Sequence, residues 1–106
     1  MSTWKDPIHP GEILADELEE IGMTAQELSK RLGVPNSRLS QILNGKRDIS
    51  ADTALRLGQF FGTGPDLWLN LQKAYELDIA RQKIGDSLKS IKRYHPTPAQ
   101  PDVGVA

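Results

Sequence analysis

Five polar side chains between positions 36 and 41 are the residues whose chemistry is most informative in this sequence. They lie in a nine-residue segment, 35–43, in which Leu39, Ile42 and Leu43 recur at the three- and four-residue spacing of one helix face. Such a helix turns its polar residues outward, where amide, guanidinium and hydroxyl groups can pair with base edges in a DNA major groove. The segment therefore predicts that the bases are read by Asn36, Ser37, Arg38, Ser40 and Gln41.

A second set of residues is placed to hold phosphate groups. Asn44, Lys46 and Arg47 follow directly after the predicted reading helix, where they could fix its register on the DNA backbone. Thr24 and Gln26 lie at the start of an earlier helix, whose free N-terminal amides favour an anion. We therefore expect these five residues to bind phosphates.

The elements that position these residues are helices, and no segment shows the alternation of a strand. Thr24 and Glu27 form a T-x-x-E capping box, Gly33 is suited to the turn that ends this helix, and Ser29 is small enough for a helix crossing. Residues 24–44 thus form a helix-turn-helix. Other helices are expected from Pro10 to about Ile21, from Ser50 to about Phe61 and from about Pro65 to Arg81.

The C-terminal part of the chain is expected to be an appendage. Gly85 should interrupt the fifth helix, residues 86–94 should form a short final helix, and residues 95–106 should be a flexible tail. The predicted organisation is a domain over 1–81, a helical extension over 82–94 and the tail. Besides residues of the helix-turn-helix, the apolar positions predicted to face the core are Ile13, Leu14, Leu18, Ile21, Ala54, Leu55, Leu57, Gly58 and Phe61.

Charge is distributed unevenly along the 106 residues, although the net charge is only −1. Residues 1–22 contain six acidic residues and one lysine, whereas residues 23–62 contain three acidic and six basic residues. A basic middle behind an acidic first helix indicates either two surfaces for different partners or two simply solvated faces. The sequence has no signal-peptide pattern and no apolar run of membrane-spanning length, so we expect a soluble cytoplasmic protein.

Catalysis is not indicated. The chain has no cysteine, and its two histidines, His9 and His95, are far apart in sequence and each adjoin a proline. No zinc-protease motif, phosphate-binding loop or serine–histidine–acid set is present. We therefore expect no enzymatic activity, no catalytic residue, no metal and no cofactor.

The segment TAQELSKRLGVPNSRLSQILNGKR resembles the helix-turn-helix of the lambda-repressor-like (XRE) family. Three further segments resemble its HigA antitoxin (VapI-like) branch: HPGEIL at 9–14, ISADTALRL at 49–57, and FGT at 61–63 followed by WLNLQ at 68–72. The resemblance covers about residues 8 to 80. Two residues depart from the family pattern, since Ser29 replaces a commoner alanine and Pro35 replaces a serine cap.

This resemblance implies an all-α, five-helix lambda-repressor-like domain with a C-terminal helical extension. It also implies a homodimer that binds a pseudo-palindromic operator, represses its own operon and neutralises a RelE-like (HigB-type) mRNA-cleaving toxin. Aromatic and apolar side chains on the fifth helix are candidates for the dimer interface: Trp68, Leu71 and Tyr75. Because such toxins tend to be basic, the acidic N-terminal segment is the candidate toxin-binding surface, with Trp4, Ile8, Glu17, Glu19 and Glu20.

Two alternatives stay open from the sequence alone. The protein could be an orphan XRE-family regulator without a toxin, which the gene neighbourhood would decide. It could also be a helical protein-interaction module, in which case the protein would fail to shift its own promoter DNA.

Overall fold

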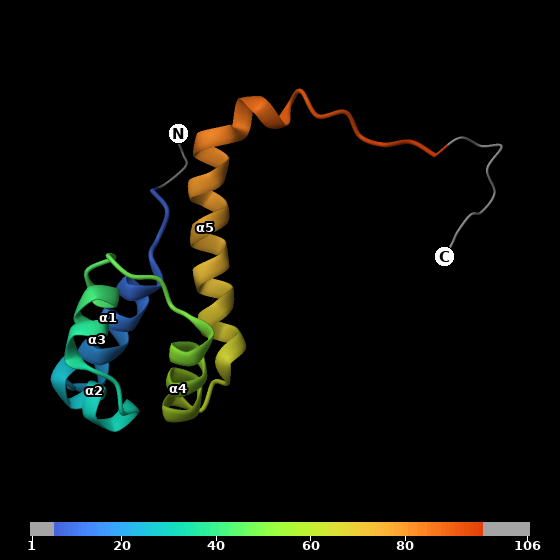
Figure 1. The fold of residues 1–106 in the computed structure, drawn as a ribbon. Helices are drawn as coiled ribbons and strands as arrows, with labels where there is room; N and C mark the ends of the chain where they lie inside the picture. Colours follow the sequence, from blue (N-terminus) through green and yellow to red (C-terminus); the bar gives the residue numbers. More distant parts are fainter. Residues whose placement is uncertain (1–5, 97–106) are drawn as a thin grey trace.

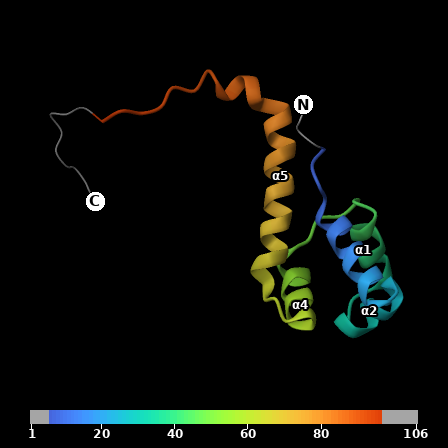
Figure 2. The same ribbon diagram turned by 180° about the vertical axis from the view of Figure 1, so that it is seen from behind.

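The computed structural model describes residues 6–96 and contains five α-helices and no strand in that part of the chain. The predicted all-α, five-helix fold is confirmed. The first three helices lie together, α4 lies beside them, and the long α5 runs past α4 and beyond the rest of the domain (Figures 1 and 2). The helices are α1 (Pro10–Ile21), α2 (Ala25–Leu32), α3 (Asn36–Leu43), α4 (Ala51–Phe61) and α5 (Pro65–Leu88).

Local capping sets where α1, α2 and α4 begin and end. Thr24 and Glu27 form the predicted capping box of α2, and the Ser50 hydroxyl accepts from the Thr53 amide at the start of α4. His9 caps α1 in the same reciprocal way with Glu12. Gly22, Gly33 and Gly62 end their helices in the left-handed conformation, which a residue with a Cβ adopts only at a cost.

The core lies where α1, α2, α3 and α4 meet the first turns of α5. Leu14, Leu28, Leu39 and Leu57 are fully buried there. Trp68 of α5 is also buried, and its indole NH donates to the Thr63 hydroxyl at 3.2 Å. This shared core fixes α3 relative to its neighbours.

Two residues predicted to face the core are exposed instead. Leu55 is 59% exposed because α4 packs through Ala54, Leu57 and Gly58, and Leu55 lies on the opposite face. Ile21 is 46% exposed at the last residue of α1.

The predicted break of the fifth helix at Gly85 is also wrong. The structure has one continuous helix from Pro65 to Leu88, and residues 91–94 are not helical. A single glycine costs a helix interior only about 1 kcal/mol, which is too little to end the helix here, so the helix passes through Gly85. Beyond Leu88 the chain turns and extends away from the domain (Figure 1). Most of the predicted tail, residues 97–106, lies outside the described residues.

Within residues 6–96, none of the helices combines the length and the apolar character needed to cross a membrane.

Candidate DNA-binding surface

Helix α3 is fixed from behind by close packing against α1. Leu39 and Ile42 are fully buried on its inner face. A Cβ atom on Gly11 would overlap the carbonyl oxygen of Ile42, so only glycine allows the two helices to approach this closely. This contact leaves the opposite, polar face of α3 turned outward.

The structure brings the predicted base-reading residues to that outer face, with one qualification. Asn36, Ser37 and Gln41 are exposed, and Ser40 is half-buried. Arg38 is half-buried, and its Nη1 lies 3.1 Å from Oδ1 of Asp52 in the first turn of α4. In this state Arg38 connects two helices, so its guanidinium would have to leave or share Asp52 in order to reach a base.

Asp52 is the centre of a small ionic network. Its Oδ1 also accepts from Nε of Arg56 at 2.8 Å, and Arg56 Nη1 donates to the Leu32 carbonyl at 2.8 Å. The hydrogen bond from Arg56, with a further contribution from Arg38, lowers the pKa of the Asp52 carboxyl below its ordinary value. The network therefore links the end of α2, the start of α4 and the side of α3. Neither Asp52 nor Arg56 was singled out from the sequence.

Gln41 and Arg47 are in direct contact. Arg47 Nε donates to Gln41 Oε1 at 2.8 Å, which orients the amide with its NH₂ group away from the arginine. Gln41, which is predicted to read a base, is thus positioned by Arg47, which is predicted to bind a phosphate.

The loop after α3 is held to the domain while its side chains stay exposed. The Lys46 amide donates to the Gln41 carbonyl at 2.8 Å, and Gly45 takes a left-handed conformation. The Ile49 amide donates to the buried Oε1 of Gln72 on α5 at 2.8 Å. Asn44, Lys46 and Arg47 remain exposed, as a phosphate clamp requires.

Sequence reasoning missed Gln72, which is 4% exposed. Its amide lies 23 positions from the amide it satisfies, so no local spacing pattern could have paired them.

The predicted phosphate site at the start of α2 is partly filled by the side chains that cap this helix. The Thr24 hydroxyl accepts from the Glu27 amide at 3.1 Å, and the Glu27 carboxylate accepts from the Thr24 amide at 2.9 Å. The hydrogen bond from the Thr24 backbone is the main cause that lowers the pKa of Glu27. A phosphate here would meet the first amides of α2 and the exposed Gln26, with the Glu27 charge nearby.

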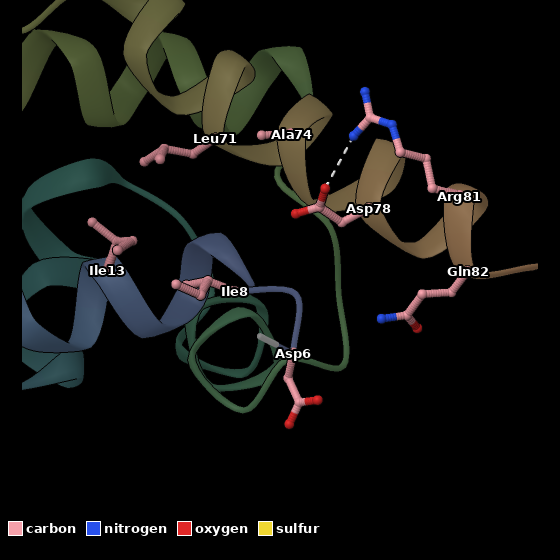
Figure 3. Close-up of a pocket in the computed structure, with 8 residues that line it drawn as sticks. All are labelled: Asp6, Ile8, Ile13, Leu71, Ala74, Asp78, Arg81 and Gln82. Carbon is pink, nitrogen blue, oxygen red and sulfur yellow. Dashed lines mark hydrogen bonds and ion pairs between the residues drawn. The ribbon is translucent and has the colours of Figure 1, made fainter. Parts of the chain in front are cut away.

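The structure corrects one predicted dimer residue. Trp68 is 2% exposed, and its ring lies 5.8 Å from that of Phe61, so it belongs to the core of its own chain and offers no surface to a partner. Tyr75 is half-buried, with its ring 4.9 Å from that of His9. Leu71 is half-buried and lines a groove of about 730 Å³ between α5 and the N-terminal segment (Figure 3).

The predicted toxin-binding residues do not form one compact cluster. Ile8 lines the groove, whereas Glu17, Glu19 and Glu20 are exposed around α1. Trp4 lies outside the described residues.

Comparisons with known proteins agree with this geometry. The family model described as helix-turn-helix matches residues 14–68. Virulence-associated protein I of Dichelobacter nodosus is 50% identical over 76 residues, which cover 71% of this chain and 70% of that protein. An addiction module antidote protein of a HigA family from Coxiella burnetii is 51% identical with a TM-score of 0.82, over 85% of this chain and all of that one. The Pseudomonas aeruginosa antitoxin HigA, solved with the higBA promoter, is 40% identical with a TM-score of 0.77, over 82% of this chain and 96% of that one. This chain therefore belongs to the helix-turn-helix family and, within it, to the HigA antitoxins.

Proposed function

We propose that this protein is the DNA-binding antitoxin of a type II toxin–antitoxin system and represses its own operon as a homodimer. The observation that carries the DNA-binding part is the outer face of α3, where Asn36 and Gln41 are exposed, with Gln41 in contact with Arg47 of the cationic loop that follows the helix. A two-fold dimer would set two such helices about 34 Å apart, on successive major grooves of a pseudo-palindrome. Similar proteins solved with operator DNA support this function, among them the antitoxin GraA.

The near-neutral net charge is compatible with this function. The cationic groups lie beside the reading helix, and a dimer doubles the phosphate contacts, so operator affinity should fall steeply with salt. The protein would act in the cytoplasm by binding and not by catalysis.

The direct test is a gel shift with the DNA upstream of the gene. The wild-type chain should shift this DNA in preference to a scrambled sequence, and the double variant Asn36→Ala/Gln41→Ala should lose that preference. A matched control is Asn70→Ala, which removes an exposed amide from α5. If the double variant binds the operator as tightly as the wild type, α3 does not read the DNA.

We further propose that the acidic surface of α1 binds a small basic RelE-like ribonuclease toxin. Glu17, Glu19 and Glu20 are exposed, and none of them forms an ion pair with another residue between positions 6 and 96. Unpaired surface carboxylates speed association with a basic partner and restrict the choice of partner.

The toxin proposal is tested by reversing these charges. The triple variant Glu17→Lys/Glu19→Lys/Glu20→Lys should bind the product of the neighbouring gene more weakly and keep its operator affinity. Asp86→Lys, which reverses an exposed acid at the far end of α5, is the control. Unchanged toxin affinity in the triple variant would remove α1 from the interface.

The second candidate is an orphan regulator of the same family. A neighbouring reading frame for a small ribonuclease-like protein, whose product is captured by this chain in a pull-down, favours the antitoxin. If no such neighbour exists and operator binding is intact, the orphan regulator is the better description.

A further inference from the structure

Asp52 is an acidic residue of α4, outside the helix-turn-helix, that contacts the helix predicted to read DNA. Its Oδ1 lies 3.1 Å from Nη1 of Arg38, and the side chains of Arg38 and Asp52 are 30% and 57% exposed. An ion pair with this much exposure adds at most about 1 kcal/mol to the stability of a fold. Stability alone therefore gives little reason for this contact.

The contact leaves Arg38 able to read a base. A guanidinium has five N–H donors, and the hydrogen bond to Asp52 uses one of them. Within residues 6–96, the other donors of Arg38 form no hydrogen bond with a side chain. Guanine is recognised by two donors that reach its N7 and O6 atoms together. Arg38 can therefore share its guanidinium between Asp52 and a guanine without leaving the carboxylate.

The carboxylate of Asp52 is itself held in place. Nε of Arg56 donates to the same Oδ1 at 2.8 Å, and Nη1 of Arg56 donates to the Leu32 carbonyl at 2.8 Å. The neighbouring residues Thr53 and Ala54 are buried on the inner side of α4. Asp52 is thus a fixed point against which the longer side chain of Arg38 is oriented.

The start of α4 does not depend on the Asp52 side chain. The Ser50 hydroxyl caps this helix by accepting from the Thr53 amide at 3.3 Å. Among the described residues, the Asp52 carboxylate accepts only from the two arginines. Asp66 holds the same second position in α5, where it is exposed and takes part in none of the ion pairs found between residues 6 and 96. Both acids favour a helix N-terminus, but only Asp52 contacts a predicted base reader.

Asp52 also changes what Arg38 is attracted to. An unpaired guanidinium on a flexible side chain is drawn to every phosphate of DNA, whatever the bases are. Asp52 offsets this positive charge and limits the orientations of the guanidinium. Less conformational entropy is then lost when the guanidinium pairs with a base.

We propose that Asp52 is a positioning residue for DNA recognition, which holds Arg38 for a guanine and keeps it from binding phosphates. Asp52 would thereby determine the guanine preference at one base pair of each half-site, although it lies on α4 and not on the reading helix. The inference rests on the proposed binding of operator DNA by α3.

A double-mutant cycle tests this proposal. Arg38→Ala, Asp52→Ala and the double variant are titrated against the operator, a set of single-base operator variants and scrambled DNA. Arg38→Ala should lose roughly tenfold of the discrimination at one guanine position. Asp52→Ala should lose at least roughly fivefold at the same position and should bind scrambled DNA more tightly. In the double variant, Asp52→Ala should cause no further loss of discrimination at that position.

Two further variants separate positioning from a structural role. Asp66→Ala removes an acid from the equivalent position of α5 and should keep the full base preference. Asp52→Asn keeps the size of the side chain and removes its charge, so it should shift both discrimination and scrambled-DNA affinity in the same directions as Asp52→Ala. Chemical denaturation of each variant shows that the fold is intact under the binding conditions.

The outcomes distinguish this inference from the proposed function. A wild-type chain that binds the operator no better than scrambled DNA would overturn both. If the wild type prefers the operator but Asp52→Ala and Asp52→Asn keep its base preference, only the positioning role is wrong. A loss of discrimination that is just as large without Arg38, or that is spread over all base positions, would show that Asp52 acts through the structure of α4 and would also overturn the inference.

Discussion

The Nε atom of Arg47 donates to Oε1 of Gln41 across 2.8 Å, so the exposed amide of α3 is oriented by the loop that follows the helix. An amide that pairs with adenine must offer its oxygen and its NH₂ group in one plane. Since the oxygen is turned toward Arg47 in this structure, the arginine determines which way the amide faces when the protein meets DNA.

Because of this contact, the contribution of base reading to operator binding can be measured separately from the contribution of positive charge. We expect Gln41→Ala to weaken operator binding by about 1–3 kcal/mol and to relax the preference at one base position. Arg47→Lys keeps the positive charge but loses the Nε donor, so it should relax the same preference without changing the salt slope. Binding assays on operator variants at several salt concentrations measure both effects. If Arg47→Lys keeps the full sequence preference, the contact with Gln41 does not matter for reading.

Lys46 should act through phosphate alone. Its side chain is exposed, and it is in none of the ion pairs found between residues 6 and 96. Lys46→Ala should therefore weaken binding to all sequences similarly and lower the salt slope by about one ion for each subunit. Lys83→Ala, which removes an exposed lysine from distal α5, is the control. A loss confined to the operator, with an unchanged salt slope, would contradict a phosphate role.

The local features of this fold could be predicted from the sequence, and the long-range ones could not. The capping box of Thr24 and Glu27 and the cap of Ser50 depend on residues three positions apart, so the starts of α2 and α4 were predictable. The exposed face of α3 followed from its apolar spacing. The Arg38–Asp52 and Ile49–Gln72 contacts join residues 14 and 23 positions apart, and no periodicity indicates them. Trp68 was misassigned because composition cannot tell a buried indole from one at an interface.

Gly11 is the residue most directly responsible for the position of α3. Gly11→Ala would drive a Cβ into the Ile42 carbonyl, so the helices must separate, and the free energy of unfolding should fall by about 1–3 kcal/mol. Operator affinity should fall as well because α3 moves. Chemical denaturation and a gel shift measure the two effects. Ala15→Gly, in an exposed position of α1, is the control and should cost only about 1 kcal/mol through helix propensity. An unchanged stability of Gly11→Ala would show that α1 and α3 can separate freely.

Gln72 should be needed for the shape of the phosphate-binding loop. Gln72→Leu keeps the volume but leaves the buried Ile49 amide without its acceptor, which should lower the free energy of unfolding by about 1–3 kcal/mol. Because the loop is then less restrained, binding to all DNA sequences should weaken. Gln82→Leu, on the exposed distal part of α5, serves as the comparison. Equal stabilities of the two variants would mean that water replaces the lost acceptor.

The stability of the protein should depend on pH in the acid range through three carboxyl groups whose pKa values are lowered in the folded state. The pKa of Glu27 is lowered mainly by the Thr24 amide, that of Asp52 by Arg56, and that of Glu76 by Gln72. A carboxyl whose folded pKa is lowered stabilises the fold above its unfolded pKa, and this stabilisation is lost as the pH falls through the folded pKa. The free energy of unfolding should therefore change little from these groups between pH 7 and about pH 5 and decrease below about pH 4. Glu27 and Asp52 are exposed and Glu76 is partly exposed, so the individual effects should be modest. Glu27→Gln keeps a capping side chain but cannot titrate, and it should flatten the acid limb of the stability curve measured by denaturation at each pH. A curve with the same acid limb as the wild type would show that the charge of Glu27 does not stabilise the cap.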